Sequence, residues 1–133
     1  MSKIEYPRPT GLLHNASFSQ VVVSSGARTI HTAGQVSIDE NGALVGAGDL
    51  AAQTAQVMRN IGRALAAAGA GYSDIVKITT YVVDYRPEHR LLIGQARAPF
   101  FAGMPPPAST LVGVAALALP EWLIEIEAVA VVD

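Results

Sequence analysis

The sequence of 133 residues contains no cysteine, which excludes disulfide bonds, thiolate zinc sites and a cysteine nucleophile. It also contains no apolar run near the roughly 18 residues that a membrane-spanning helix needs. The first nine residues lack the apolar segment of an export signal. We therefore expect a cytoplasmic protein that has no membrane partner.

Charged residues are scarce as well. Asp, Glu, Lys and Arg make up 15% of the chain, and 9 basic residues against 11 acidic ones give a net charge of −2. Nucleic-acid affinity depends mainly on basic side chains that contact phosphates, so this charge predicts no nucleic-acid partner. The Walker loop, Gly-x-Gly-x-x-Gly and Gly-x-Ser-x-Gly motifs are absent. The three histidines, at positions 14, 31 and 89, lack the spacing of metal ligands, and we expect no metal site.

Hydrophobic residues, by contrast, reach 50% of the chain, and the mean hydropathy is +0.33. The length predicts a single domain over residues 1–133. A lone domain of this size and low charge exposes much apolar surface, which favours a homo-oligomer. The alternative is a monomer whose hydrophobic content is raised by alanine, which adds little to apolar patches.

The hydrophobic pattern predicts an α+β fold with its elements in the order βββαβαββ. One amphipathic helix of about five turns is expected between an N-cap at Asp49 and an end at Gly69. A second is expected over residues 88–101, bent near Pro99. The expected strands cover residues 19–25, 28–33 with an extension at 36–38, 43–45, 75–83, 108–116 and 124–132, after an irregular lead-in over residues 1–16.

Glycine-containing turns join the first expected strands. Gly26-Ala27 predicts a hairpin between the first two strands, and Asn41-Gly42 predicts a second hairpin. Gly34 interrupts a strand pattern, which indicates a bulge or a group that needs close access to the backbone. Each helix has one apolar stripe, so we expect both on one face of a single sheet. The other face then has no cover within the chain, which is a second reason to expect a homo-oligomer.

The last expected strand carries two carboxylates. Its alternation places Glu125 and Glu127 on one face and Ile124 and Ile126 on the other. Two same-side carboxylates about 7 Å apart are costly to bury fully. Either the strand lies at a sheet edge, where both glutamates are solvated, or one of them is a cleft carboxylate that positions a water or moves a proton.

Four stretches, in this order, resemble the YjgF-type reactive-intermediate deaminases, the Rid family. They are Gly34-Gln35 after a hairpin, the helix that begins near Asp49, residues 74–84, and residues 107–131 with Pro120. The resemblance implies a chorismate-mutase-like α+β fold and a homotrimer. In such a trimer the sheets form a central barrel, and three clefts lie between the subunits.

The resemblance also implies hydrolysis of enamines and imines, such as 2-aminoacrylate and 2-iminopropionate, to 2-oxo acids and ammonia, with no metal or organic cofactor. In the family, an arginine after Pro-Ala binds the substrate carboxylate, and a glutamate in the final strand acts on the water. The glutamate corresponds to Glu125. The arginine has no counterpart, because Pro107-Ala108 is followed by Ser109 and Thr110.

Without that arginine we expect a carboxylate to bind roughly ten- to hundredfold more weakly, and substrate preference to be altered. Two further positions differ from the family pattern, since Phe18 stands where a tyrosine is usual and Gly94 where an asparagine is common. The resemblance assigns substrate binding to Ser109, Thr110, Phe18 and the backbone near Gly34.

Two arginines are candidates to replace the missing one. Arg97 in the second helix and Arg28 in the second strand either reach a cleft of the trimer or are solvated surface residues. Trp122, the one tryptophan, either forms a pocket wall or packs in the loop before the last strand.

Three functions remain to be compared. The first hypothesis is an enamine or imine deaminase, a hydrolase of a small metabolite with a C=N bond, in which Glu125 orients the water. The alternative is a non-catalytic trimer that binds a small metabolite in the same cleft. Ribonuclease activity, which older family names suggest, is disfavoured by the net charge of −2.

Overall fold

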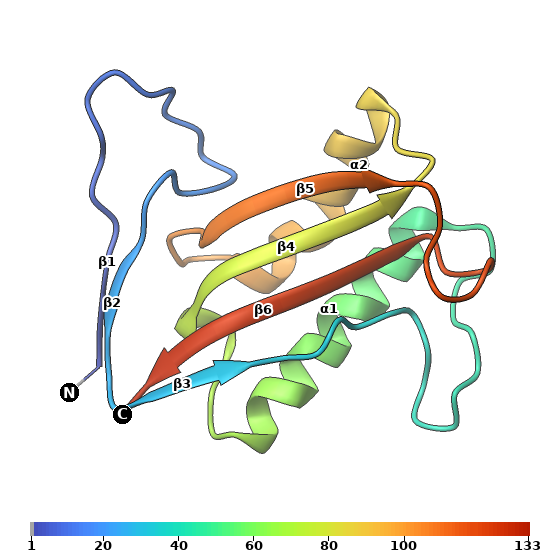
Figure 1. Cartoon of the computed structure of the whole chain (residues 1–133), viewed down its shortest axis with the longest axis horizontal. Coiled ribbons are helices and arrows are strands. Elements are labelled where there is room, and N and C mark those ends of the chain that lie inside the picture. The colour runs from blue at the N-terminus through green and yellow to red at the C-terminus, as the bar shows by residue number, and fades with distance from the viewer. Residues whose placement is uncertain (1) are drawn as a thin grey trace.

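The computed structural model describes residues 2–133, in which ten short and long elements follow one another along the chain (Figure 1). The strands are β1 (Lys3–Glu5), β2 (Val23–Ser25), β3 (Arg28–His31), β4 (Ile75–Val83), β5 (Ala108–Val114) and β6 (Ile124–Val132). The helices are α1 (Leu50–Ala67) and α2 (Pro87–Arg97), with 3-10 turns η1 (Tyr72–Asp74) and η2 (Ala98–Phe101). No helix in these residues has both the length and the apolarity to cross a membrane.

Helix α1 forms because its apolar residues recur every three or four positions and both of its ends are capped. The Asp49 carboxylate accepts a hydrogen bond from the Ala52 backbone N at 3.0 Å. At the other end, Gly69 takes the left-handed conformation, with φ of +77°, that commonly follows a helix. The apolar stripe between these caps is fully buried and consists of Val57, Met58, Ile61 and Leu65.

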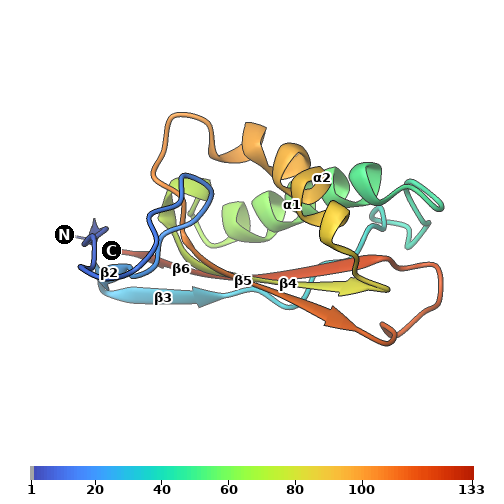
Figure 2. The same ribbon diagram turned by 90° about the horizontal axis from the view of Figure 1, so that it is seen from above.

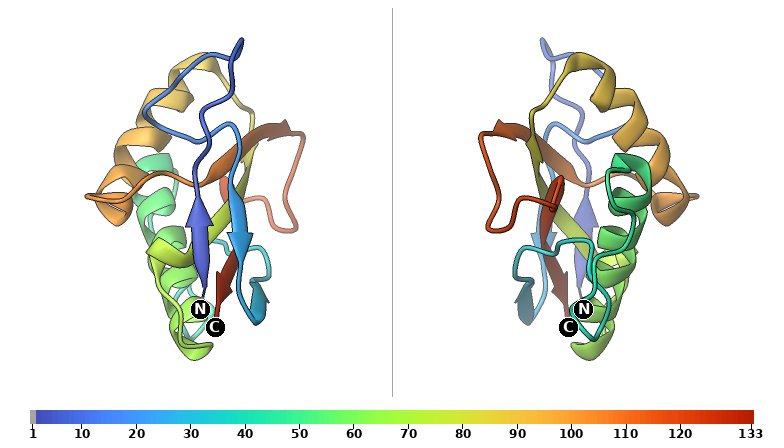
Figure 3. Two further views of the ribbon diagram at one scale, coloured as in Figure 1. Left: turned by 90° about the vertical axis from the view of Figure 1, so that its left-hand side faces the viewer. Right: turned by 90° about the vertical axis from the view of Figure 1, so that its right-hand side faces the viewer.

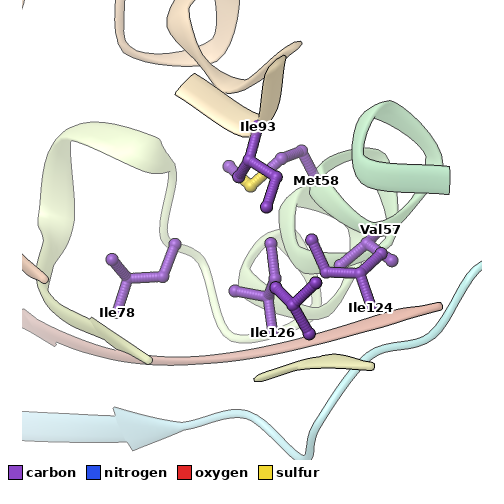
Figure 4. Close-up of a cluster of buried hydrophobic side chains, with 7 residues drawn as sticks. Val57, Met58, Ile78, Ile93, Ile124 and Ile126 are labelled. Carbon is purple, nitrogen blue, oxygen red and sulfur yellow. The ribbon is translucent and has the colours of Figure 1, made fainter. Parts of the chain in front are cut away.

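The main sheet has four strands in the order β3-β6-β4-β5, in which β4 and β5 are parallel and the other pairs antiparallel. Both helices lie on one face of this sheet (Figure 2). The core between the two layers joins α1, α2, β4 and β6 through Val57, Met58, Ile93, Ile78, Ile124 and Ile126 (Figure 4). The prediction of an α+β fold with two helices packed on one sheet face is confirmed.

The first strands differ from the prediction. β2 pairs with β1 as a separate two-stranded sheet, whereas β3 pairs with β6. The predictions of a hairpin at Gly26-Ala27 and of a single sheet are therefore wrong. The long strand β6 is the reason, because it extends to Val132 and offers a full row of backbone partners to β3. The predicted irregular lead-in contains the short strand β1, but residues 6–16 are irregular as expected. Figure 3 shows the β1–β2 pair beside this end of the main sheet, close to both termini.

The predicted strands at residues 36–38 and 43–45 are reduced to a single bridge between Ile38 and Leu44. The Asp39 carboxylate accepts hydrogen bonds from the backbone N of Asn41 and of Ala43, both at 2.9 Å. Such side-chain bonds stabilise a compact turn without a strand ladder. The hairpin predicted at Asn41-Gly42 is therefore present only as a turn closed by one bridge, and its flanking strands do not form.

The second face of the main sheet is not covered by any other element among residues 2–133 (Figure 2). Its side chains alternate along each strand with those of the core. They are half-buried in β4 and β6 and include Lys77, Thr79, Tyr81, Glu125 and Glu127. This open face combines charged, hydroxyl and apolar groups on rigid strands.

Candidate functional site

Glu125 lies on the open face, directly against the backbone of Gly34. Two backbone hydrogen bonds between Gln35 and Ile126, at 2.7 and 3.0 Å, hold this segment beside β6. A Cβ atom at Gly34 would lie only 2.7 Å from Cδ of Glu125. Glycine is therefore required for the carboxylate to lie where it does, which gives the interruption of the strand pattern at Gly34 a physical reason.

The two glutamates of β6 have different surroundings. β6 lies between β3 and β4, so the explanation of solvated glutamates on an edge strand is wrong. Glu127 Oε1 accepts a hydrogen bond from the Tyr81 hydroxyl at 2.9 Å. This hydrogen bond, followed by burial and by the charges of Glu127 and Glu125, raises the pKa of Tyr81. Glu125 itself accepts no hydrogen bond within residues 2–133, so its carboxylate is available to a ligand or a water.

Tyr81 was not among the residues expected at the site. Its position in β4 is directly in register with Glu125, and its side chain shares the open face with both glutamates. The alternation of β4 predicts which residues share a face with Tyr81. It does not predict that β6 is the neighbouring strand, because strand pairing does not follow from local sequence.

Ser109 lies on the other side of the sheet, at a cavity of about 320 Å³ next to α2 that Phe18 also lines. Ser109 is in register with the buried Ile78, so its side chain is directed to the helix layer. The backbone N of Ser19 donates to the carbonyl of Pro107 at 3.1 Å, and this bond places Phe18 beside the start of β5. The structure thus brings Ser109 and Phe18 together.

Thr110 does not share that cavity. It is in register with Thr79 and lies on the open face, where its hydroxyl accepts a hydrogen bond from the Lys77 ammonium at 2.6 Å. Neighbouring residues of a strand point to opposite faces. The site residues expected from the sequence therefore form two groups in one chain, Gly34, Thr110 and Glu125 on the open face and Phe18 and Ser109 at the cavity.

The two candidate arginines differ in their surroundings. Arg97 of α2 lines the cavity of Ser109, and its Nη1 donates to the hydroxyl of the buried Thr80 at 3.3 Å. Its Nε is buried without a hydrogen-bond partner, and this burial lowers the pKa of Arg97. Arg28 is exposed and donates to the backbone carbonyls of Asp133 and Ala68. Arg97 is therefore not a solvated surface residue, and Arg28 serves to hold the end of β6.

Gln53 of α1 fixes the loop that leads into β6. Its amide is fully buried and donates to the carbonyls of Gly46 and Glu121, both at 3.1 Å. Its oxygen accepts a hydrogen bond from the backbone N of Leu123 at 3.0 Å. Trp122 is half-buried within this loop. Gln53 therefore fixes Leu123, the residue that precedes β6 and lies two residues before Glu125.

The histidines lie apart from one another. His14 is within 3.3 Å of the Arg8 guanidinium, and His89 Nδ1 accepts a hydrogen bond from the Arg86 backbone N at 3.0 Å. His31 belongs to β3. In the described part of the chain, no three His, Asp or Glu side chains come together as possible ligands of a metal ion.

Comparison with known proteins gives one consistent result. The family model described as Endoribonuclease L-PSP matches residues 11–132. A RutC family protein of Pyrococcus horikoshii is 34% identical over 124 residues, which cover 93% of this chain and 90% of that protein. The crystal structure of the Rid family protein YyfB from Yersinia pestis matches with a TM-score of 0.92 and 42% identity, over 96% of this chain and 98% of that one. The chain belongs to the YjgF-type Rid family.

Similarity to a Rid protein of named activity is more limited. The human 2-iminobutanoate/2-iminopropanoate deaminase is 33% identical over 67 residues, which cover 50% of this Rid protein and 47% of the human one. Rid family proteins are typically oligomeric. An oligomer would explain why one face of the sheet is open in the single chain. The substrate has to be inferred from the residues of the site.

Proposed function

We propose that this Rid protein is a homotrimeric hydrolase that converts small reactive enamines or imines to carbonyl compounds and ammonia. The observation that carries the proposal is the Glu125 carboxylate, held against Gly34 on a half-buried face without a hydrogen-bond partner in residues 2–133. Such a carboxylate is suited to orient a water and to accept its proton. The partial similarity to the human 2-iminobutanoate/2-iminopropanoate deaminase supports the same class of reaction.

A second chain completes the site in this proposal. Within one chain, Glu125 and the cavity of Ser109 lie on opposite faces of the sheet. β5 is an edge strand, so the cavity at β5 is accessible to the open face of a neighbouring chain. Three such contacts close a ring in which the sheets form a central barrel and a cleft lies at each junction. The ring also covers Val112, which is 38% exposed in the single chain.

The reaction adds one water to the carbon of the C=N bond. The substrate reacts as the iminium, protonated on nitrogen. As the water oxygen bonds to this carbon, the C=N electron pair moves to the nitrogen, which becomes an amine, and Glu125 accepts a proton from the water. The protonated glutamate then returns this proton to the amine. The C–N bond breaks and ammonia leaves, while the carbinol hydroxyl gives its proton to Glu125 as the carbonyl forms, and Glu125 then releases to solvent the proton that entered on the iminium. An enamine enters the same sequence after protonation of its β-carbon has converted it to the imine. The sum is one imine and one water in, and one carbonyl compound and one ammonia out.

Substrate contacts in the cleft come from both groups of residues. The Phe18 ring supplies an apolar wall, and the Ser109 hydroxyl supplies a donor at the position where the family resemblance implies an arginine. The backbone near Gly34 lies beside Glu125 and contacts the reacting end of the substrate. Thr110 binds Lys77 and borders the open face of the same cleft. Because Ser109 stands where the family resemblance implies an arginine, we expect the substrate preference to differ from that of proteins that have the arginine.

The test is a coupled assay in which an amino-acid oxidase supplies 2-imino acids and the release of 2-oxo acid is followed. Glu125→Gln removes the base with little change in size and is expected to lower the rate by about 10²–10⁴-fold. Glu127→Gln is the matched control, because Glu127 is occupied by the Tyr81 hydroxyl, and it is expected to keep most of the activity. If the unaltered protein accelerates release from none of several amino acids, the proposal is wrong.

The second candidate is a trimer that binds a small metabolite in the same cleft without turnover. Ser109 and Phe18 favour it, because neither supplies the guanidinium or phenol that the family resemblance implies at these positions. In that case Glu125→Gln changes the affinity for the metabolite while no product forms. An RNA substrate, which the description of the matching family model suggests, has no support from a net charge of −2.

A further inference from the structure

Arg97 is a cation held inside the protein without a counter-charge. Its Nη1 donates to the hydroxyl of Thr80, which is fully buried. Its Nε is buried and has no hydrogen-bond partner, and Arg97 forms no ion pair with a carboxylate among residues 2–133. A buried charge of this kind is costly unless an anion approaches it. A ligand that carries an anionic group removes that cost.

One edge of the guanidinium has no hydrogen-bond partner among residues 2–133. Nε and Nη2 lie side by side on the edge away from Thr80, and neither donates to a described residue. Two parallel N–H donors match the two oxygens of a carboxylate, which is the strongest arrangement that arginine forms with an anion. The hydrogen bond from Nη1 to Thr80 holds the plane of the group, and the edge formed by Nε and Nη2 is left without a partner.

The cavity beside Arg97 has the size and charge of a site for a small anion. Its volume is about 320 Å³, and its lining includes the hydroxyl of Ser109, the ring of Phe18 and a second guanidinium from Arg90. No acidic side chain lines it. Of these two arginines, Arg90 is exposed and Arg97 is half-buried. A carboxylate that enters meets two guanidinium groups and hydroxyl donors beside apolar side chains, and no negative charge.

We propose that Arg97 binds the carboxylate of the substrate in place of the arginine that Ser109 replaces in β5. This inference rests on the proposed function, because it treats the cavity of Ser109 as part of the same site. Arg97 then selects imines that carry a carboxylate over neutral imines. Arg97 then holds the substrate carboxylate from the side of α2. The small side chain of Ser109 leaves room in the cavity for this carboxylate.

The test measures binding of 2-oxobutanoate, a stable 2-oxo acid, against its neutral isostere 2-oxobutanamide by calorimetry. The unaltered protein is expected to prefer the carboxylate by roughly ten- to hundredfold, and Arg97→Met to lose that preference. Arg86→Met is the matched control, because Arg86 precedes α2 and lines neither cavity beside it, and it is expected to keep the preference. If Arg97→Met does not fold, Arg97→Gln removes the charge and can still donate to Thr80.

A rescue variant makes the assignment specific. Adding Ser109→Arg to Arg97→Met returns a guanidinium to the cavity from β5 and is expected to restore the preference for the carboxylate. The proposal is overturned if the unaltered protein shows no preference, or if folded Arg97→Met or Arg97→Gln keeps it in full. Carboxylate binding through Arg97 without imine hydrolysis would support this inference and contradict the proposed function. If the protein hydrolyses imines and Arg97→Met does not change the rate, the proposed function is supported and the role of Arg97 is contradicted.

Discussion

Replacement of Gly34 by alanine adds one methyl group at the point where the chain passes the Glu125 carboxylate. The new Cβ would lie 2.7 Å from Cδ and 2.9 Å from Cγ of Glu125. Ordinary carbon–carbon contacts lie near 3.5–4.0 Å, so the side chain has to move by about 1 Å. The backbone needs no change, because Gly34 is not among the residues with a positive φ.

The size of the effect follows from this displacement. A shift of about 1 Å in a group that must face the reacting atoms costs about 10²-fold in rate. Stability is affected in the other direction, since alanine at a compatible position stabilises by about 0.4–1 kcal/mol through the unfolded chain. Gly34→Ala is therefore expected to lose about 10²-fold in kcat while its Tm falls little or not at all.

The assay is release of 2-oxo acid from 2-imino acids, together with a thermal melt of each variant. Gly71→Ala is the matched control, because a Cβ at Gly71 meets no atom within 4 Å and the residue has a φ of −135°. We expect the control to keep full activity. An active Gly34→Ala with an unchanged kcat would show that the position of the Glu125 carboxylate against Gly34 is not part of the mechanism.

Two further predictions concern stability. Gln53→Ala leaves the Gly46 and Glu121 carbonyls and the Leu123 N–H without their partner. We expect it to lower the free energy of unfolding, measured by urea titration, by about 2–4 kcal/mol. A loss no larger than that of Gln95→Ala would contradict this expectation. The raised pKa of Tyr81 contributes stability that is present below the ordinary pKa of 10.0 and lost as pH rises through the folded-state value. The free energy of unfolding should therefore fall more steeply above pH 10 in the unaltered protein than in Tyr81→Phe, and parallel curves would disprove the linkage.

Local patterns were sufficient for the elements that form the core. α1 follows from its three- and four-residue spacing with Asp49 and Gly69 at its ends. β4 and β6 have the predicted bounds, 75–83 and 124–132, because each is a β-branched run bounded by loop residues. In each case the residues that determine the element lie within it or next to its ends, so the sequence alone is enough to predict it.

Pairing and burial were not predictable in the same way. The strand that β3 joins depends on β6, about a hundred residues later, so the turn signal at Gly26-Ala27 predicted the wrong partner. Ser109 and Thr110 are adjacent in the sequence, yet strand alternation separates them onto opposite faces. The burial of Arg97 depends on how α2 packs over Thr80, which no local pattern contains.

The most direct test of a site completed by two chains is sedimentation velocity of the active protein at micromolar concentration. The account predicts one species with three times the single-chain mass of 13.9 kDa. It also predicts that imine hydrolysis is lost under conditions that dissociate this species. Fully active particles of 13.9 kDa would contradict it, because a single chain holds Glu125 and the cavity of Ser109 on opposite faces of its sheet.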